Sequence, residues 1–495
     1  MLPINHNDAS LKKELGDVIE LQKNGQNEEA ILRLQSLSSQ FPGHSKPYFL
    51  LGISHYHLKE FDQATDQISR AIAINPNAAE YHTSLGVVFS ASGKKKLAEL
   101  RWRAAIRLKP EQPEAYFHLG DAHIDRGQAQ KAIDWLKQAV ALKPTFLEAW
   151  NNLGLCYKAL KQPAQAKNCF EKTIKLDPDF INGHVNLAVT HLITGDYING
   201  WQEYLWRFKL QESPIAFSAP EGVPLWRGEP LAGKHLLLLS EQGFGDTLQF
   251  VRYLPILKTL CQQITLISPK LLLPLLERMT EIDRLESQDQ SLGTIDYYLP
   301  LMTIPHVLKT TLESIPTQTP YLSCDPEQIQ AWSDRLPEVP LRIGLVWEGK
   351  PLFQNDPLRR RSVTLESLAP LAANDRKILF VSLQKGEPAR QIEHAPEPMN
   401  ILNLDSHINN FADTAAIIEN LDLVITIDTA TAHLCGALAK KVWILLPYAP
   451  DWRWGLESDR TPWYPSAKLF RQQTPNQWQE PIEQMAAQLK EWPIT

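Results

Sequence analysis

Apolar and small residues recur along the first part of the chain with a period of 34. Each unit has a Leu-Gly pair, an alanine twelve residues after the glycine, a large apolar residue four further on, and a closing proline. The aligned sets are Leu51, Gly52, Ala64, Ile68 and Pro76; Leu85, Gly86, Ala98, Trp102 and Pro110; Leu119, Gly120, Ala132, Leu136 and Pro144; and Leu153, Gly154, Ala166, Phe170 and Pro178. A small residue lets two helices approach, a large one fills the space opposite, and proline ends the second helix. The period therefore predicts stacked helical hairpins.

A different pattern follows the repeats. Residues 211–233 hold four prolines and three glycines without a helical period, which indicates a linker. Beyond it, apolar runs alternate with helical patterns, which favours parallel sheets flanked by helices. The predicted strands are residues 236–240, 264–268, 296–299, 341–347, 377–382, 401–404, 423–427 and 442–446, with 469–470 as an edge. The predicted helices are 247–260, 270–279, 477–492 and a helix of small residues opened by Thr431.

These patterns divide the chain into five predicted parts. They are a solenoid over residues 1–205, a linker over 206–234, an α/β half over 235–335, a second α/β half over 341–476, and a C-terminal helix over 477–495. The fold class expected is thus an α-solenoid followed by two Rossmann-like halves.

Composition narrows the function classes. The net charge of -6 and the pI near 6.2 give no basic character, so nucleic acid is not expected as a partner. Five cysteines without a Cys-x-x-Cys pair indicate a reducing compartment. No apolar run reaches the roughly 18 residues of a membrane span, and the N-terminus does not resemble a signal peptide. We therefore expect a cytoplasmic protein without a transmembrane segment.

Three polar segments follow predicted strands and carry the candidate chemistry. The first is Ser240–Thr247, the second runs from Trp347 to Ser362 and contains Lys350 and three consecutive arginines, and the third is Asp428–His433. Ligands bind at the carboxyl ends of parallel strands. A polar turn that opens a helix there presents unpaired backbone N–H groups to phosphate, so the third segment predicts a nucleotide site.

Two simpler motifs are absent or misplaced. Leu248 occupies the third glycine position of a Gly-x-Gly-x-x-Gly fingerprint that begins at Gly243, which disfavours a nicotinamide cofactor. Asp177 and Asp179 match an Asp-x-Asp metal motif, but they flank the proline that closes a repeat, where aspartates are ordinary turn residues. No metal and no cofactor are predicted.

The repeats resemble tetratricopeptide repeats in their period, Leu-Gly pair and closing proline. The three polar segments together resemble the glycosyltransferase 9 (heptosyltransferase-like) family in the form fused behind such repeats. The likeness covers roughly Pro224 to Gln472, and Pro447–Pro465 continues it. The resemblance implies a GT-B fold, in which substrates meet between two Rossmann-like halves, and a metal-independent, inverting glycosyl transfer from a nucleotide-sugar donor.

Within the first segment, the resemblance implies that Asp246 removes the proton from an acceptor hydroxyl. Two alternatives stay open: Asp246 caps a helix start, or it binds the acceptor without proton transfer. A capping aspartate has a lowered pKa and is a weak base. Gln242, Gly243 and Gly245 form the same acceptor-side turn, in which the glycines permit a tight bend.

The donor side is assigned to residues of the second half. Lys350, Arg360 and Arg361 offer the cations that a departing diphosphate needs, although an arginine run is usually a solvated face. Asp428, Thr429, Thr431 and His433 offer hydrogen bonds to phosphate or sugar, and packing is the alternative for His433. Trp452 and Arg453 could stack on a base or cover the cleft, and the alternative is that they only pin their loop.

The function that follows is transfer of a sugar to a hydroxyl, with a protein or peptide acceptor held in the groove of the repeats. A lipid-linked or polysaccharide acceptor is one alternative. Another class is a scaffold protein whose α/β region is inactive or only binds sugar.

Overall fold

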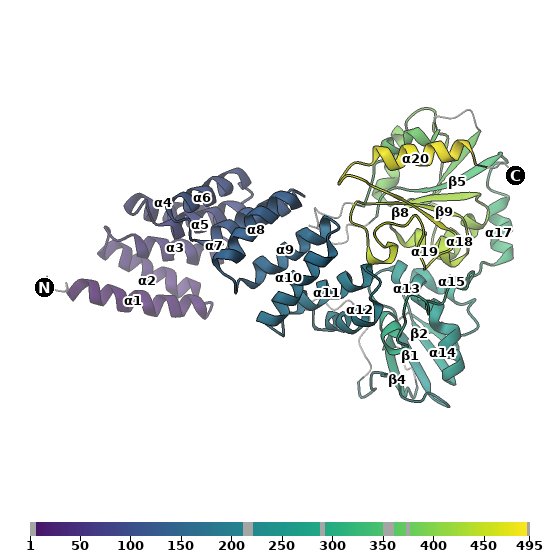
Figure 1. Cartoon of the computed structure of the whole chain (residues 1–495), viewed down its shortest axis with the longest axis horizontal. Helices are drawn as coiled ribbons and strands as arrows, with labels where there is room; N and C mark the ends of the chain where they lie inside the picture. Colours follow the sequence, from purple (N-terminus) through teal and green to yellow (C-terminus); the bar gives the residue numbers. More distant parts are fainter. Residues whose placement is uncertain (1–5, 211–220, 288–292, 350–360, 373–376, 493–495) are drawn as a thin grey trace. The chain divides into compact units, whose positions relative to one another are not determined.

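The computed structural model describes residues 6–210, 221–287, 293–349, 361–372 and 377–492, with side chains from residue 10 onward. The chain forms two compact units, Met1–Cys156 and Tyr157–Thr495, and the division falls inside helix α9 (Leu147–Ala159). Many of the helices and strands of both units are labelled in Figure 1.

The first unit is a stack of helical hairpins. Its helices are α1 (His6–Lys23), α2 (Asn27–Gln40), α3 (Ser45–His57), α4 (Phe61–Ile74), α5 (Ala79–Ala91), α6 (Lys95–Leu108), α7 (Pro113–Ile124), α8 (Ala129–Leu142) and the start of α9. The repeat pattern explains how the hairpins close. A Cβ atom added at Gly52 would lie 2.5 Å from Ile68, and one at Gly120 would lie 2.7 Å from Leu136. The glycine and the large apolar residue therefore fit each other as predicted.

Polar residues at two repeat positions hold the turns. His82 and Trp150 each place a ring nitrogen 3.0 Å from the carbonyl oxygen of the proline six residues earlier. His55 and His123 instead contact the side chains of Glu60 and Gln128 at 2.6 and 2.8 Å, across the hairpin turn. These positions are structural.

Helices of the same type continue into the second unit. α10 (Pro163–Leu176), α11 (Ile181–Ile193), α12 (Tyr197–Tyr204) and the 3-10 helix η1 (Leu205–Lys209) precede the first sheet. Asp177 accepts a bond from the Asp179 backbone N–H at 3.0 Å, as expected for a turn residue. Trp201 of α12 is 1% exposed and belongs to the same hydrophobic core as the first sheet.

The first sheet has four parallel strands in the order β3-β2-β1-β4. They are β1 (His235–Leu239), β2 (Gln263–Ile267), β3 (Arg284–Glu286) and β4 (Tyr297–Pro300). The predicted helix over residues 247–260 is wrong in its bounds, because α13 (Phe244–Phe250) begins three residues earlier. It gives way to η2 (Val251–Tyr253) and α14 (Leu254–Leu260), where Pro255 opens the new helix. The segment predicted as helix 270–279 is η3 (Lys270–Leu272) and α15 (Leu273–Leu276).

The second sheet has six parallel strands in the order β10-β9-β8-β5-β6-β7. They are β5 (Leu341–Val346), β6 (Ile378–Ser382), β7 (Ile401–Asn403), β8 (Leu423–Ile427), β9 (Val442–Leu446) and β10 (Ala467–Arg471). This is the order of a doubly wound Rossmann-type fold, whose order reverses between β5 and β8. α20 (Gln479–Lys490) lies against this sheet (Figure 1), with η5 (Glu366–Ala372) beside it. The predicted fold class is confirmed.

The remaining elements connect or cover the sheets. They are η4 (Leu301–Thr303), α16 (Ile304–Val307), α17 (Pro326–Ser333), η6 (Glu387–His394), α18 (Phe411–Glu419), α19 (Ala430–Ala437) and η7 (Trp452–Trp454). Part of the predicted linker joins the first sheet, since the Trp226 backbone N–H donates to Tyr298 O at 2.9 Å. Across the described residues, every helix is too short or too polar to cross a membrane.

Candidate functional site

The turn after β1 is held open by a residue other than glycine. Gln242 has φ +58, a left-handed conformation that side chains rarely adopt. Its amide donates to the Tyr204 hydroxyl at 2.8 Å. Gly243 has φ -100 and ψ 171, which any residue adopts, so the prediction that Gly243 provides the bend is wrong. The special conformation belongs to Gln242, whose side chain is fixed by α12.

Asp246 lies on the first turn of α13, three residues after the N-cap Gly243. Its Oδ2 accepts from the Gly243 backbone N–H at 2.9 Å, and its Oδ1 pairs with Arg453. The Asp246 side chain is 17% exposed. Burial raises the pKa of Asp246, while Arg453 and the Gly243 N–H oppose that rise. Asp246 is thus a cap, as one alternative held. Its pKa is nevertheless raised by burial, whereas a capping aspartate is expected to have a lowered pKa.

The first and third polar segments are in contact. A Cβ atom added at Gly245 would lie 2.7 Å from Cδ2 of His433 and 3.5 Å from Cα of Ala430. Glycine is therefore required where α13 crosses the start of α19. The GT-B resemblance implies that substrates meet between the two halves. The contact brings Gly245, the neighbour of Asp246, against the start of the helix that follows β8.

The third segment opens α19 at the reversal of strand order. Thr429 is the N-cap, and its hydroxyl lies 3.0 Å from that of Thr426. The first N–H groups of a helix have no partner within it and can bind an anion. Asp428 and Thr431 are both 8% exposed. Burial and the neighbouring Asp451 raise the pKa of Asp428, and Arg361 opposes the rise.

His433 is buried among aromatic rings. Its Nδ1 lies 2.8 Å from the Tyr464 hydroxyl, and its ring stacks on Trp454 with centroids 5.3 Å apart. Burial lowers the pKa of His433 well below its usual range, so the ring is neutral. The structure favours packing for most of this side chain, with its Cδ2 edge turned toward Gly245.

The second segment follows β5. The Gln384 side chain accepts from the Trp347 and Glu348 backbone N–H groups at 3.1 and 2.9 Å, which shapes the strand end. Arg361 donates to the Asp428 carbonyl oxygen at 2.8 Å, so the second and third segments also meet. Lys350 and Arg360 lie outside the described residues, and their assignment to phosphate stays a prediction.

Trp452 and Arg453 lie in η7 and are 3% and 7% exposed. The Trp452 ring meets Trp201 edge to face at 5.2 Å and Trp463 at 5.7 Å. A ring enclosed in this way has no free face for a nucleotide base. Of the two alternatives, the structure favours a pinned loop for Trp452. Arg453 has a different place, directly on Asp246.

Sequence reasoning missed several supporting residues. Arg207 is 1% exposed and donates to both Glu241 oxygens at 2.9 Å and to Thr303 at 2.8 Å. Glu241 also accepts from the Met302 backbone N–H at 2.9 Å. Glu241 lay within the first polar segment, and an acid between two apolar stretches was a usable signal. Nothing in the sequence pointed to Arg207.

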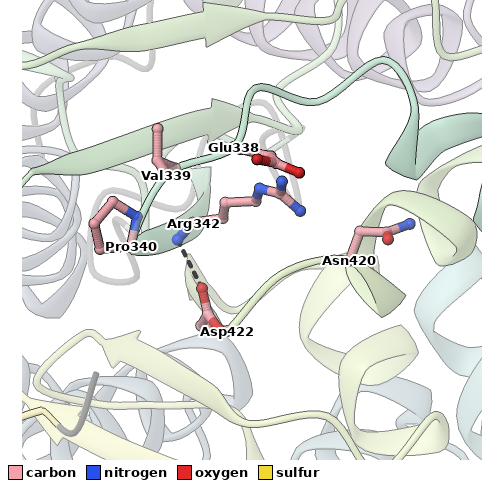
Figure 2. Close-up of a pocket in the computed structure, with 6 residues that line it drawn as sticks. All are labelled: Glu338, Val339, Pro340, Arg342, Asn420 and Asp422. Atoms are coloured by element: carbon pink, nitrogen blue, oxygen red, sulfur yellow. Dashed lines mark hydrogen bonds between the residues drawn. The ribbon is translucent and has the colours of Figure 1, made fainter. Parts of the chain in front are cut away.

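One hollow of about 480 Å³ lies elsewhere in the second unit (Figure 2). Its lining residues are Glu338, Val339, Pro340, Arg342, Asn420 and Asp422. The Arg342 backbone N–H donates to Asp422 at 2.7 Å, at the points where β5 and β8 begin. Because ligands of such sheets bind at the carboxyl ends, this hollow is at the wrong end for the nucleotide. In the described part of the chain, no cluster of three or more His, Cys, Asp or Glu side chains could hold a metal ion.

Comparison with known proteins defines the class of the helical region. Models of the tetratricopeptide repeat match residues 21–86, 120–161 and 147–180, so these hairpins are tetratricopeptide repeats. The matched segments end before the α/β region.

Individual proteins are also similar to the chain. Protein FlbA of Caulobacter vibrioides is 26% identical over 336 residues, which are 62% of this chain and 54% of FlbA. The chain thus spans about half the length of that relative. Among solved structures, MamA is 25% identical over 32% of this chain and 93% of its own, with a TM-score of 0.30. Pseudomonas aeruginosa pilF is 26% identical over 33% of this chain and 75% of its own, with a TM-score of 0.32.

Proposed function

We propose that the α/β region is a metal-independent glycosyltransferase and that the repeats present its acceptor. Asp246 takes the proton of an acceptor hydroxyl while the acceptor oxygen bonds to the anomeric carbon of a nucleotide sugar. The bond from that carbon to the diphosphate breaks, and the nucleoside diphosphate leaves. The start of α19 and Arg361, with Lys350 and Arg360, stabilise the leaving charge. Inversion at the anomeric carbon rests on the glycosyltransferase resemblance.

The observation that carries the proposal is the contact of Gly245 with His433. It brings a carboxylate at the end of β1 next to a helix start at the strand reversal of a Rossmann-type sheet. A base and an anion-binding helix start are the two parts that transfer from a nucleotide sugar requires. Tetratricopeptide repeats bind proteins, which supports a protein acceptor.

A scaffold with an inactive α/β region is the second candidate. It is favoured by the engagement of both Asp246 oxygens, one by Gly243 and one by Arg453. In this second candidate the carboxylate holds two elements together and removes no proton.

The test incubates the purified chain with UDP-, GDP- and ADP-sugars and a lysate of its host, and measures nucleotide release and sugar transfer. Asp246→Asn should reduce turnover by about 10²- to 10⁴-fold, the usual contribution of a general base. Asp413→Asn is the matched control, because Asp413 lies on the first turn of α18 and accepts from the Asn409 backbone N–H at 2.9 Å. Like Asp246, it holds the backbone at the start of its helix, but it has no part in the proposed chemistry.

The outcomes separate the candidates. If the wild-type protein neither binds nor turns over any of these nucleotide sugars, the transferase function fails and the scaffold function remains. Equal activity of Asp246→Asn and wild type would remove Asp246 as the base. Mass spectrometry of the lysate then identifies the acceptor. A hexose mass on a protein supports the proposal. Transferred sugar in the lipid or polysaccharide fraction would show instead that the acceptor is lipid-linked or a polysaccharide.

A further inference from the structure

Arg453 is a buried cation that joins η7 to the start of α13. Its Nη2 pairs with Asp246, its Nε donates to the Gln249 side chain, and its Nη1 donates to Asp451 at 2.9 Å. All of these acceptors are side-chain oxygens, and Asp246 and Gln249 lie more than 200 residues away along the chain. A guanidinium can hold several acceptors in one fixed geometry because its five N–H groups form a rigid fork.

Arg453 is itself held in place. Its guanidinium lies 4.3 Å from the centroid of the Trp452 ring, and its carbonyl oxygen accepts from the Thr461 hydroxyl at 3.0 Å. The Asp451 side chain also accepts from the Arg453 backbone N–H at 3.1 Å. The side chain therefore meets Asp246 from a pre-organised position.

The Asp246 carboxylate is oriented by two donors from different elements. Gly243 fixes Oδ2 from within the turn, and Arg453 fixes Oδ1 from η7. Each carboxylate oxygen can accept more than one hydrogen bond, and 17% of the side chain remains exposed. A carboxylate held at both oxygens presents its remaining lone pairs in one direction.

We propose that Arg453 is a positioning residue that aims the Asp246 carboxylate at the acceptor hydroxyl and keeps it ionised. The inference rests on the proposed function, in which Asp246 is the base. It assigns the Trp452–Trp454 turn a direct link to the reacting group in addition to its packing role.

The charges around Asp246 shift its pKa in opposite directions. Arg453 of η7 favours the ionised carboxylate, and Asp451, the residue before η7, opposes it. Glu241, in the turn after β1, opposes it as well. The Tyr204 hydroxyl and the neutral His433 face the same region from α12 and α19. A base must be ionised, so the rate rises with pH through the pKa of Asp246. Loss of Arg453 should raise that pKa, whereas loss of the Asp451 charge should lower it.

The experiment compares pH-rate profiles of nucleotide release for Arg453→Gln and Asp451→Asn, using the sugar nucleotide that wild type turns over fastest. We expect the acid limb to move to higher pH in Arg453→Gln and to lower pH in Asp451→Asn. At the optimum, Arg453→Gln should lose on the order of 100-fold in kcat because the base is misplaced. The KM for the donor should stay the same, and Arg453→Lys should recover part of the rate.

Arg471→Gln is the matched control. Arg471 is 7% exposed and donates to the carbonyl oxygens of Gly455 and Ser458, so its loss loosens the same loop without removing a charge beside Asp246. The acid limb of Arg471→Gln should coincide with that of wild type, whatever its rate. An unchanged limb in Arg453→Gln, or a shift in the same direction in both test variants, would overturn the inference.

A second measurement separates this inference from the proposed function. Carboxyl ¹³C NMR of aspartate-labelled protein follows the titration of Asp246 directly, with its signal assigned by its loss in Asp246→Asn. If no sugar nucleotide is turned over, the transferase function fails. Opposite shifts of the Asp246 titration in the two variants would still support the control of its ionisation by Arg453, and absent shifts would refute it.

Discussion

At the scale of residues, glycines set how closely helices approach. Gly86 faces Trp102, and a Cβ atom there would overlap the indole ring. Trp102 cannot move away easily, because it is 3% exposed and its indole N–H donates to the Thr83 carbonyl oxygen at 3.1 Å. The Leu-Gly pair of the repeat is thus a packing requirement rather than a backbone one.

Gly86→Ala is therefore expected to destabilise the repeats by roughly 1 to 3 kcal/mol, the usual effect of overpacking a core. Urea unfolding followed by circular dichroism measures the change. Gly16→Ala is the control, since nothing lies within 4 Å of a Cβ atom at that position in α1. It should stabilise the protein by about 0.5 to 1 kcal/mol through helix propensity. Equal effects of both variants would contradict the packing argument.

At the scale of elements, every described strand except β3 (Arg284–Glu286) was predicted, and the pieces between the strands were predicted poorly. β8 and β9 have the predicted bounds because both are continuous apolar runs that are buried on both faces. α18 was missed, although its Asn410 N-cap accepts two backbone N–H bonds. Pro255, Pro274 and Pro305 each open a short helix, which a search for long periodic helices passes over.

Within the candidate site, too, some contacts could be predicted from the sequence and others could not. The meeting of the second and third segments follows from sheet topology, because β5 and β8 are neighbours and their carboxyl ends share an edge. The first segment follows a strand of the other sheet, so its contact with the third segment was expected only from the resemblance to a GT-B fold. The pairing of Asp246 with Arg453 depends on packing between elements 207 residues apart, which no local pattern records. The left-handed Gln242 was equally hidden, since two neighbouring glycines offered a simpler explanation of the turn.

The buried pair of Arg207 and Glu241 joins η1 to the turn after β1, with both side chains at most 2% exposed. Removing one partner leaves an uncompensated buried charge, so Arg207→Met should destabilise the second unit by about 3 to 5 kcal/mol. The double variant Arg207→Met, Glu241→Gln should recover part of that loss, because neither charge remains. Thermal unfolding of the two single variants and the double variant measures the coupling. Additive losses would show that the pair does not act as a unit.

At the scale of the whole molecule, the two compact units divide inside the array of helical hairpins. The 34-residue pattern predicted a boundary at residue 205, and that boundary stays a prediction, but the compact units divide at Cys156 and Tyr157. Repeats are equivalent in sequence because each packs on its neighbour. The last helices of the array have the α/β region as their neighbour, and the period does not reveal this.

A truncation tests how far the α/β region depends on those helices. Tyr197, Trp201 and Tyr204 are all buried. The Tyr197 hydroxyl accepts from the Trp463 indole N–H at 3.2 Å, and Trp201 meets Phe250 edge to face at 6.0 Å. Fully burying one aromatic side chain contributes about 1.5 to 3 kcal/mol, so losing all three removes a large share of the 5 to 15 kcal/mol that typically stabilises a folded protein.

A chain of residues 163–495 is therefore expected to unfold cooperatively on heating, whereas residues 211–495 should aggregate or lack a cooperative transition. Differential scanning calorimetry distinguishes the two. Tyr197→Ala, Trp201→Ala in the longer chain is the intermediate case, and its transition should move to lower temperature. If residues 211–495 melted as cooperatively as residues 163–495, α11 and α12 would belong energetically to the repeats alone. The contacts of Tyr204 with Gln242 and of Arg207 with Glu241 would then contribute little to the stability of the α/β region.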